Sequence, residues 1–127
     1  MKKIIFFLSV MLLSACSACK VAKSSPIQEI RFGHGGGFTG AVRSYTLKSD
    51  GTIWQQDKQI KKIPCDSLSA IFELVEELPQ ADYVHPGNTY HFVRINMPDK
   101  KYNYTWSPDQ LPDRKVVELY FKLNKQL

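Results

Sequence analysis

Several features are missing from this sequence, and each absence narrows what the chain can be. The longest apolar stretch, residues 4–13, falls short of the roughly 20 residues that a helix needs to span a bilayer permanently. No run of lysines and arginines is interleaved with aromatic residues, so we expect no nucleic-acid partner. The three histidines, His34, His85 and His91, have no zinc-binding spacing and no acidic residue at a metal-like interval. We therefore expect neither a metal nor another cofactor.

The length and composition of the chain predict one globular domain of modest size. The chain has 127 residues, of which 43% are hydrophobic and 12% aromatic, an ordinary composition for a folded protein. The formal charge is +5, and removal of Lys2 and Lys3 with an N-terminal signal would reduce it to +3. Such a mild excess is typical of a solvated surface.

The N-terminus has the three parts of a secretion signal. Lys2 and Lys3 form a positive segment, an apolar segment follows, and small residues then precede a cysteine. The stretch Leu13-Ser14-Ala15-Cys16 resembles the lipobox of bacterial lipoproteins, in which the cysteine thiol receives a diacylglycerol before cleavage. This resemblance implies a signal peptide over residues 1–15. It also implies that Cys16 carries the diacylglycerol and an acyl chain such as palmitate, and that residues 16–26 form a flexible tether.

The resemblance also implies a location in the cell envelope. Two or more acyl chains anchor a protein stably, because each buried methylene contributes roughly 0.8 kcal/mol. In lipoproteins of this kind an aspartate after the lipidated cysteine often retains the protein at the inner membrane, so Ser17 points to the outer membrane. The alternative is an ordinary signal peptide with a coincidental cysteine. Cys19 has a similar context but lacks a leucine three residues upstream, so Cys16 is favoured.

Two further cysteines remain after Cys16. An oxidising envelope would permit a disulfide between Cys19 and Cys65. Because Cys19 lies in the expected tether, we instead expect Cys65 to be buried as a small apolar residue.

Hydrophobic patterning predicts an α+β domain over residues 27–127, with the order β-β-β-α-β-β-α. The expected strands cover residues 27–33, 41–49, 52–56, 90–97 and 102–106, with a tight turn at Asp50-Gly51. The first expected helix starts at Asp66 or Ser67 and ends before Pro79, and the second starts from a capping box over residues 107–110. Residues 82–89 are expected to form a loop. Short connections favour a small antiparallel sheet of about five strands with two helices packed on one face.

Two finer expectations concern aromatic and histidine side chains. Tyr102, Tyr104 and Trp106 alternate along one strand, so they should pack against the helix that carries Ile71, Phe72 and Val75. His91 fits the core-facing pattern poorly and is expected at an edge or on the surface.

The one unusual segment is Gly33-His34-Gly35-Gly36-Gly37-Phe38-Thr39-Gly40. Five glycines in eight residues weaken local stability, so some geometric demand should explain them. No Gly-Lys-Ser/Thr sequence follows, and the next element is a strand, which excludes a Walker loop and a dinucleotide fingerprint. Two readings remain open. Either the segment is a hairpin loop that folds Phe38 onto the core, or it is an exposed loop that presents residues 35–40 (Gly35, Gly36, Gly37, Phe38, Thr39 and Gly40) to a partner.

No constellation of catalytic residues stands out. Glu73, Glu76 and Glu77 share one helix, and the last two are expected on its wet face. Ser44, Ser67 and Ser69 lack a nucleophile-elbow context. A non-enzyme is therefore favoured, with a small hydrolase as the weaker alternative.

The order of elements resembles one known family. The features are residues 36–40 after a first strand, a helix ending at Leu78-Pro79, a strand over residues 90–95 and a closing helix preceded by Pro112. Together they resemble the emfourin-type small domains, a family that includes protein inhibitors of thermolysin-like metallopeptidases. They also resemble small envelope lipoproteins that carry the same glycine-rich stretch. The resemblance implies a compact α+β domain that binds a protein or peptide, including a peptidase as a target. The alternative is a structural envelope lipoprotein with no specific ligand.

Overall fold

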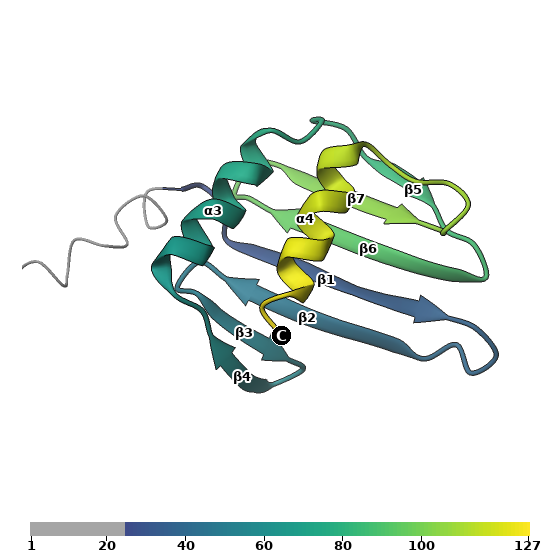
Figure 1. Cartoon of the computed structure of the whole chain (residues 1–127), viewed down its shortest axis with the longest axis horizontal. Coiled ribbons are helices and arrows are strands. Elements are labelled where there is room, and N and C mark those ends of the chain that lie inside the picture. The colour runs from purple at the N-terminus through teal and green to yellow at the C-terminus, as the bar shows by residue number, and fades with distance from the viewer. Residues whose placement is uncertain (1–24) are drawn as a thin grey trace, which may run out of the picture.

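The strands of this chain pair into one mixed sheet, covered on one face by two helices (Figure 1). The structure, a computed structural model, describes residues 25–127. The strands are β1 (Glu29–Gly36), β2 (Val42–Lys48), β3 (Thr52–Gln55), β4 (Lys58–Lys62), β5 (Tyr83–His85), β6 (Thr89–Asn96) and β7 (Lys101–Trp106). The helices are α3 (Cys65–Glu76) and α4 (Arg114–Asn124). The α+β class is therefore confirmed.

The sheet is larger than the sequence predicts. Its seven strands follow the order β4-β3-β2-β1-β6-β7-β5, and only the pairing of β5 with β7 is parallel. The expectation of about five strands missed β4 and β5, the two edge strands. All five residues of β4 are exposed, so β4 has no apolar alternation to reveal it. Strand β5 has three residues and lies within the region expected to be a loop, where turn-forming residues dominate.

Both helices begin at other residues than the sequence predicts. Residues 107–110 form a turn, in which the Gln110 N–H donates to the Ser107 carbonyl at 3.1 Å, and not a capping box. Helix α4 starts later, where the Asp113 carboxylate accepts a hydrogen bond of 2.9 Å from the Lys115 N–H. Helix α3 starts directly after Pro64 and has no side-chain cap. Pro79 follows the end of α3 as expected.

The core lies between the sheet and the two helices. Tyr104 and Trp106 of β7 are almost fully buried in the same cluster as Ile71 and Phe72 of α3, and Tyr102 is half-buried at its margin. The prediction that this row shares a core with the helix is confirmed, although the ring of Trp106 meets Tyr120 of α4. The turn at Asp50-Gly51 is also confirmed, because the Gly51 N–H donates to the Lys48 carbonyl. None of the helices within residues 25–127 is long and apolar enough to cross a membrane.

Cys65 differs from its expected state. It is disulfide-bonded and half-buried at the first residue of α3, so the expectation of a small buried thiol is wrong. The other cysteines of the chain, Cys16 and Cys19, lie outside the described residues, as does the predicted signal peptide.

Candidate functional site

The base of the glycine-rich segment belongs to the sheet. Strand β1 runs through to Gly36, so the expected end of this strand at Gly33 is wrong. Gly35 is buried, and a Cβ there would lie 2.8 Å from the Tyr90 hydroxyl oxygen, because the Tyr90 ring crosses this position on β6. Gly36 has a φ of +93°, and a Cβ there would lie 2.1 Å from the Asn88 carbonyl oxygen. Glycine is therefore required at both positions for close packing. Gly35 and Gly36 belong to β1, so neither is part of an exposed loop that could contact a partner.

The tip of the segment is an exposed tight turn. The Gly40 N–H donates to the Gly37 carbonyl at 3.2 Å, which closes a turn with Phe38 and Thr39 at its centre. The Gly37 N–H donates to the Asn88 carbonyl at 2.8 Å and holds the base of this turn against the chain before β6. Phe38 is fully exposed. Neither hypothesis from the sequence holds for the whole segment. The glycines at its base are needed for packing within the sheet, whereas the tip exposes the Phe38 side chain to solvent.

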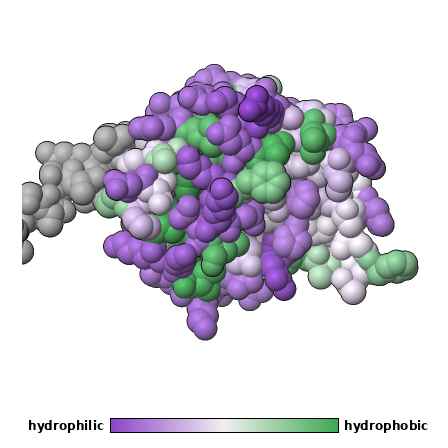
Figure 2. All heavy atoms as spheres, in the orientation of Figure 1, coloured by the Kyte–Doolittle hydropathy of each residue, from purple (hydrophilic) through white to green (hydrophobic). Residues whose placement is uncertain are grey.

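The tip projects from one end of the molecule. Figure 1 shows the β1–β2 connection extending beyond the sheet, at the end opposite to the point where the chain enters β1. Figure 2, in the same orientation, shows an apolar tip there that stands clear of the rest of the surface. Since an eight-residue strand is about 26 Å long, β1 alone separates the two ends by that distance.

Three histidines lie in one register row at the same end of the sheet, with Trp106 between His91 and His85. His34 pairs with His91 across β1 and β6, and both His91 and His85 pair with Trp106 of β7. His91 is half-buried in an interior strand, so its expected edge or surface position is wrong. Its Nδ1 lies 2.9 Å from the Tyr120 hydroxyl of α4. Burial lowers the pKa of His91, and the neighbouring His34 lowers it further.

No family model and no curated protein matches this chain. The resemblances to lipoproteins and to emfourin-type domains therefore remain predictions from short motifs. The function has to be argued from the geometry of the described residues.

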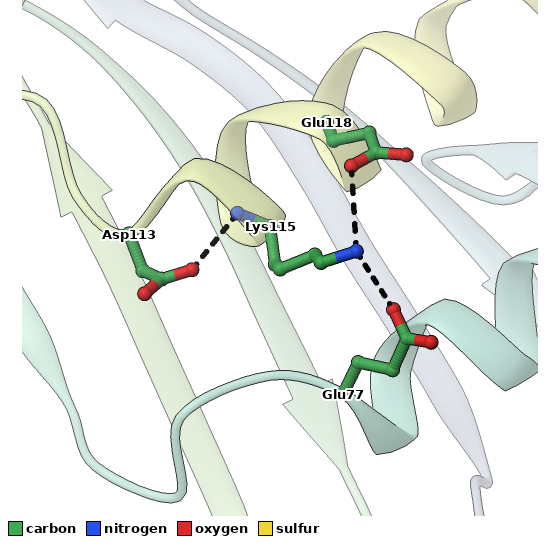
Figure 3. Close-up of polar contacts among 4 residues, drawn as sticks. All are labelled: Glu77, Asp113, Lys115 and Glu118. Atoms are coloured by element: carbon green, nitrogen blue, oxygen red, sulfur yellow. Dashed lines mark hydrogen bonds and ion pairs between the residues drawn. The ribbon is translucent and has the colours of Figure 1, made fainter.

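The carboxylates expected on the wet face of α3 are exposed, and one of them links the two helices (Figure 3). Glu77 Oε2 lies 3.0 Å from Lys115 Nζ, and Glu118 Oε2 lies 4.0 Å from the same atom. The hydrogen bond with Glu77 raises the pKa of Lys115. Because these groups are exposed to solvent, the bridge stabilises the fold little.

Within residues 25–127, no group of three or more histidine, cysteine or acidic side chains is placed to hold a metal ion.

Sequence reasoning missed a pair of arginines on the helix-free face of the sheet. Arg31 of β1 and Arg94 of β6 are direct register partners. Each stands between core residues along its strand, and this alternation could have placed each arginine on the outer face. The sequence could not show that the two lie opposite each other, because the β1–β6 pairing joins residues far apart in the chain.

Proposed function

We propose that this chain is a lipid-anchored, non-enzymatic protein of the bacterial cell envelope that binds another protein or peptide through its β1–β2 loop. In this proposal Cys16 carries the lipid, the outer membrane is the site of anchoring, and Phe38 is the central contact. The observation that carries the proposal is the full exposure of Phe38 on a turn whose base is hydrogen-bonded to the chain before β6. A peptidase is one target that suits such a loop.

The construction of the loop supports a binding role. An aromatic side chain in water gains nothing for the fold, whereas aromatic residues dominate the energy of many protein interfaces. The hydrogen bond between Gly37 and Asn88 and the turn between Gly37 and Gly40 restrict the loop before any partner arrives. Less conformational entropy is then lost on binding. Gly37 and Gly40 shape the turn, while Phe38 and Thr39 supply the exposed side chains.

The position of the loop supports a partner away from the anchoring membrane. The chain reaches β1 from its N-terminal side at Glu29, and the loop leaves β1 after Gly36 at the other end of the strand. A lipid on Cys16 would therefore hold the domain by the end opposite to Phe38. The loop would project toward the compartment rather than into the anchoring bilayer.

The test uses the intact protein purified in detergent from envelopes. A photoreactive phenylalanine analogue at position 38 should crosslink a defined partner, and the same analogue at Phe121, an exposed residue of α4, is the matched control. Phe38→Ala should change the free energy of unfolding by no more than about 0.5 kcal/mol. It should weaken binding to the captured partner by about 2 kcal/mol. Unchanged affinity in Phe38→Ala, with affinity lost in Phe121→Ala, would refute the role of the loop. A structural lipoprotein would give no position-specific crosslink at all.

A further inference from the structure

A separate cavity of about 330 Å³ opens on the helix-free face of the sheet, over β1, β6 and β7. It lies at the end of β1 opposite to the glycine-rich segment, so it is independent of the loop. Its charged lining comes from Glu29, Arg31, Asp82, Arg94 and Lys101, and Asn96 and Asn103 add side-chain amides. The volume is near the lower end of the range for small-molecule sites, which suits a ligand of the size of an amino acid or dipeptide.

The two arginines of this cavity are left without an anionic partner. Arg31 and Arg94 stand directly opposite each other on adjacent strands, an arrangement in which like charges destabilise a sheet. Both ion pairs found within residues 25–127 belong to Lys115, so neither arginine has a carboxylate within ion-pair distance there. The Arg94 guanidinium carbon lies 4.8 Å from the centre of the Phe92 ring, and this stacking restricts the side chain. Both arginines line the cavity, and guanidinium groups are well suited to bind a carboxylate.

The same cavity contains acidic groups that are not neutralised. Glu29 and Asp82 both line it, and the ion pairs of the described chain include neither of them. Asp82 Oδ1 accepts a hydrogen bond of 2.9 Å from the Asn103 N–H, which leaves its second oxygen available. A simple anion would be attracted by the cations but repelled by these carboxylates. A ligand with charges of both signs can satisfy both sets.

We propose that this cavity binds a short zwitterionic peptide, with the ligand carboxylate between Arg31 and Arg94 and its ammonium group beside Glu29 and Asp82. Such a peptide carries one carboxylate and one ammonium group, and the cavity is lined by side chains of both opposite charges. The site adds a small-molecule specificity to the protein that does not depend on the proposed role of Phe38.

The first experiment tests the chemistry of the ligand by calorimetric titration of the intact protein in detergent. The probes are alanyl-alanine, its N-acetylated form and its C-terminal amide. Saturable binding of alanyl-alanine, with each capped form at least about tenfold weaker, is the expected result. Equal binding of the N-acetylated form would overturn the proposal and leave a simple anion site. Absence of saturable binding by alanyl-alanine at millimolar concentration would also overturn it.

The second experiment assigns the binding to the cavity. Arg31→Gln and Glu29→Gln should each weaken alanyl-alanine binding by at least about tenfold. Lys58→Gln, which removes an exposed charge on β4, should leave binding unchanged. Arg94→Gln should also weaken binding by at least about tenfold, and the thermal midpoint of each variant checks that it is folded. Equal weakening by Lys58→Gln would show that net charge alone is responsible and would refute the assignment.

Discussion

His91 and Tyr120 are joined by a contact of 2.9 Å between the imidazole Nδ1 and the phenolic oxygen, which links an interior strand to the final helix. The two ring centres lie 5.0 Å apart, and Trp106 flanks both rings. Burial lowers the pKa of His91 and raises the pKa of Tyr120, so it favours the neutral form of each group. The ring centre of His34 lies 6.4 Å from that of His91, and this neighbour lowers the pKa of His91 further.

We expect this arrangement to make the fold sensitive to mild acid. Because the folded pKa of His91 lies below its ordinary value of 6.5, the unfolded chain binds a proton more readily than the folded one. Stability should therefore fall as the pH drops through the mid-six range and below. Thermal midpoints measured from about pH 7 to about pH 5 should decline more steeply for the native protein than for His91→Gln. Coincident profiles for the two proteins would contradict the expectation. Arg43, the register partner of His34 on β2, is present in both proteins, so its effect cancels in the comparison.

The buried aromatic row gives the largest expected loss of stability. Trp106 is 2% exposed and meets Tyr120 edge to face, with ring centres 5.3 Å apart. Trp106→Ala should lower the free energy of unfolding by about 3–5 kcal/mol, measured by denaturant titration. Trp54→Ala is the matched control, because Trp54 is only half-buried on β3 and its Nε1–H donates to the Thr52 hydroxyl. If both substitutions have the same effect, Trp106 is not the core residue that its burial indicates.

The elements that contribute to the core could be predicted from the sequence. Alternation placed Tyr104 and Trp106 on one face, and helical spacing predicted α3 with Ile71 and Phe72 inside. Both patterns are local, since each depends on neighbours within a few positions. They mark the residues that the fold buries, because burial selects apolar side chains at a fixed period.

The edges of the sheet and the candidate sites could not be predicted in the same way. Strand β4 is fully exposed and has no apolar period, while β5 depends on pairing with the distant β7. The row of histidines and the opposed Arg31 and Arg94 arise from strand register, which the sequence does not state locally. The composition of the glycine-rich segment is unusual in the sequence alone. Its division into a packed base and an exposed tip depends on Tyr90 and Asn88, which lie far along the chain.

Two neighbouring glycines separate the effect of packing from the effect of backbone conformation. Gly36 and Gly37 have φ values of +93° and +84°, so alanine is disfavoured at both. A Cβ at Gly37 meets no atom within 4 Å, whereas a Cβ at Gly36 would collide with the Asn88 carbonyl. Gly37→Ala should therefore cost about 1–2 kcal/mol of unfolding free energy. Gly36→Ala should cost a further 1–3 kcal/mol or so, because the chain before β6 must move. If the two substitutions lower the free energy of unfolding equally, the backbone at Asn88 moves away from the new Cβ at no cost.

The cysteines offer a covalent test of the proposed anchor. Cys65 is disulfide-bonded, and the chain has only two other cysteines, Cys16 and Cys19. A sulfur that carries diacylglycerol as a thioether cannot also form a disulfide. The lipoprotein proposal therefore predicts that Cys19 is the partner of Cys65.

Single serine substitutions distinguish the two pairings. Cys19→Ser should leave one thiol that alkylates without reduction at Cys65, and should lower the free energy of unfolding by about 2–4 kcal/mol. Cys16→Ser should instead leave the disulfide intact and abolish labelling by a fatty-acid probe. Peptide mapping of the alkylated protein reads out the first result, and gel fluorescence of the probe reads out the second. If Cys16→Ser frees the Cys65 thiol, the sulfur of Cys16 is committed to the disulfide. Lipidation of Cys16 would then be wrong, whatever the glycine loop binds.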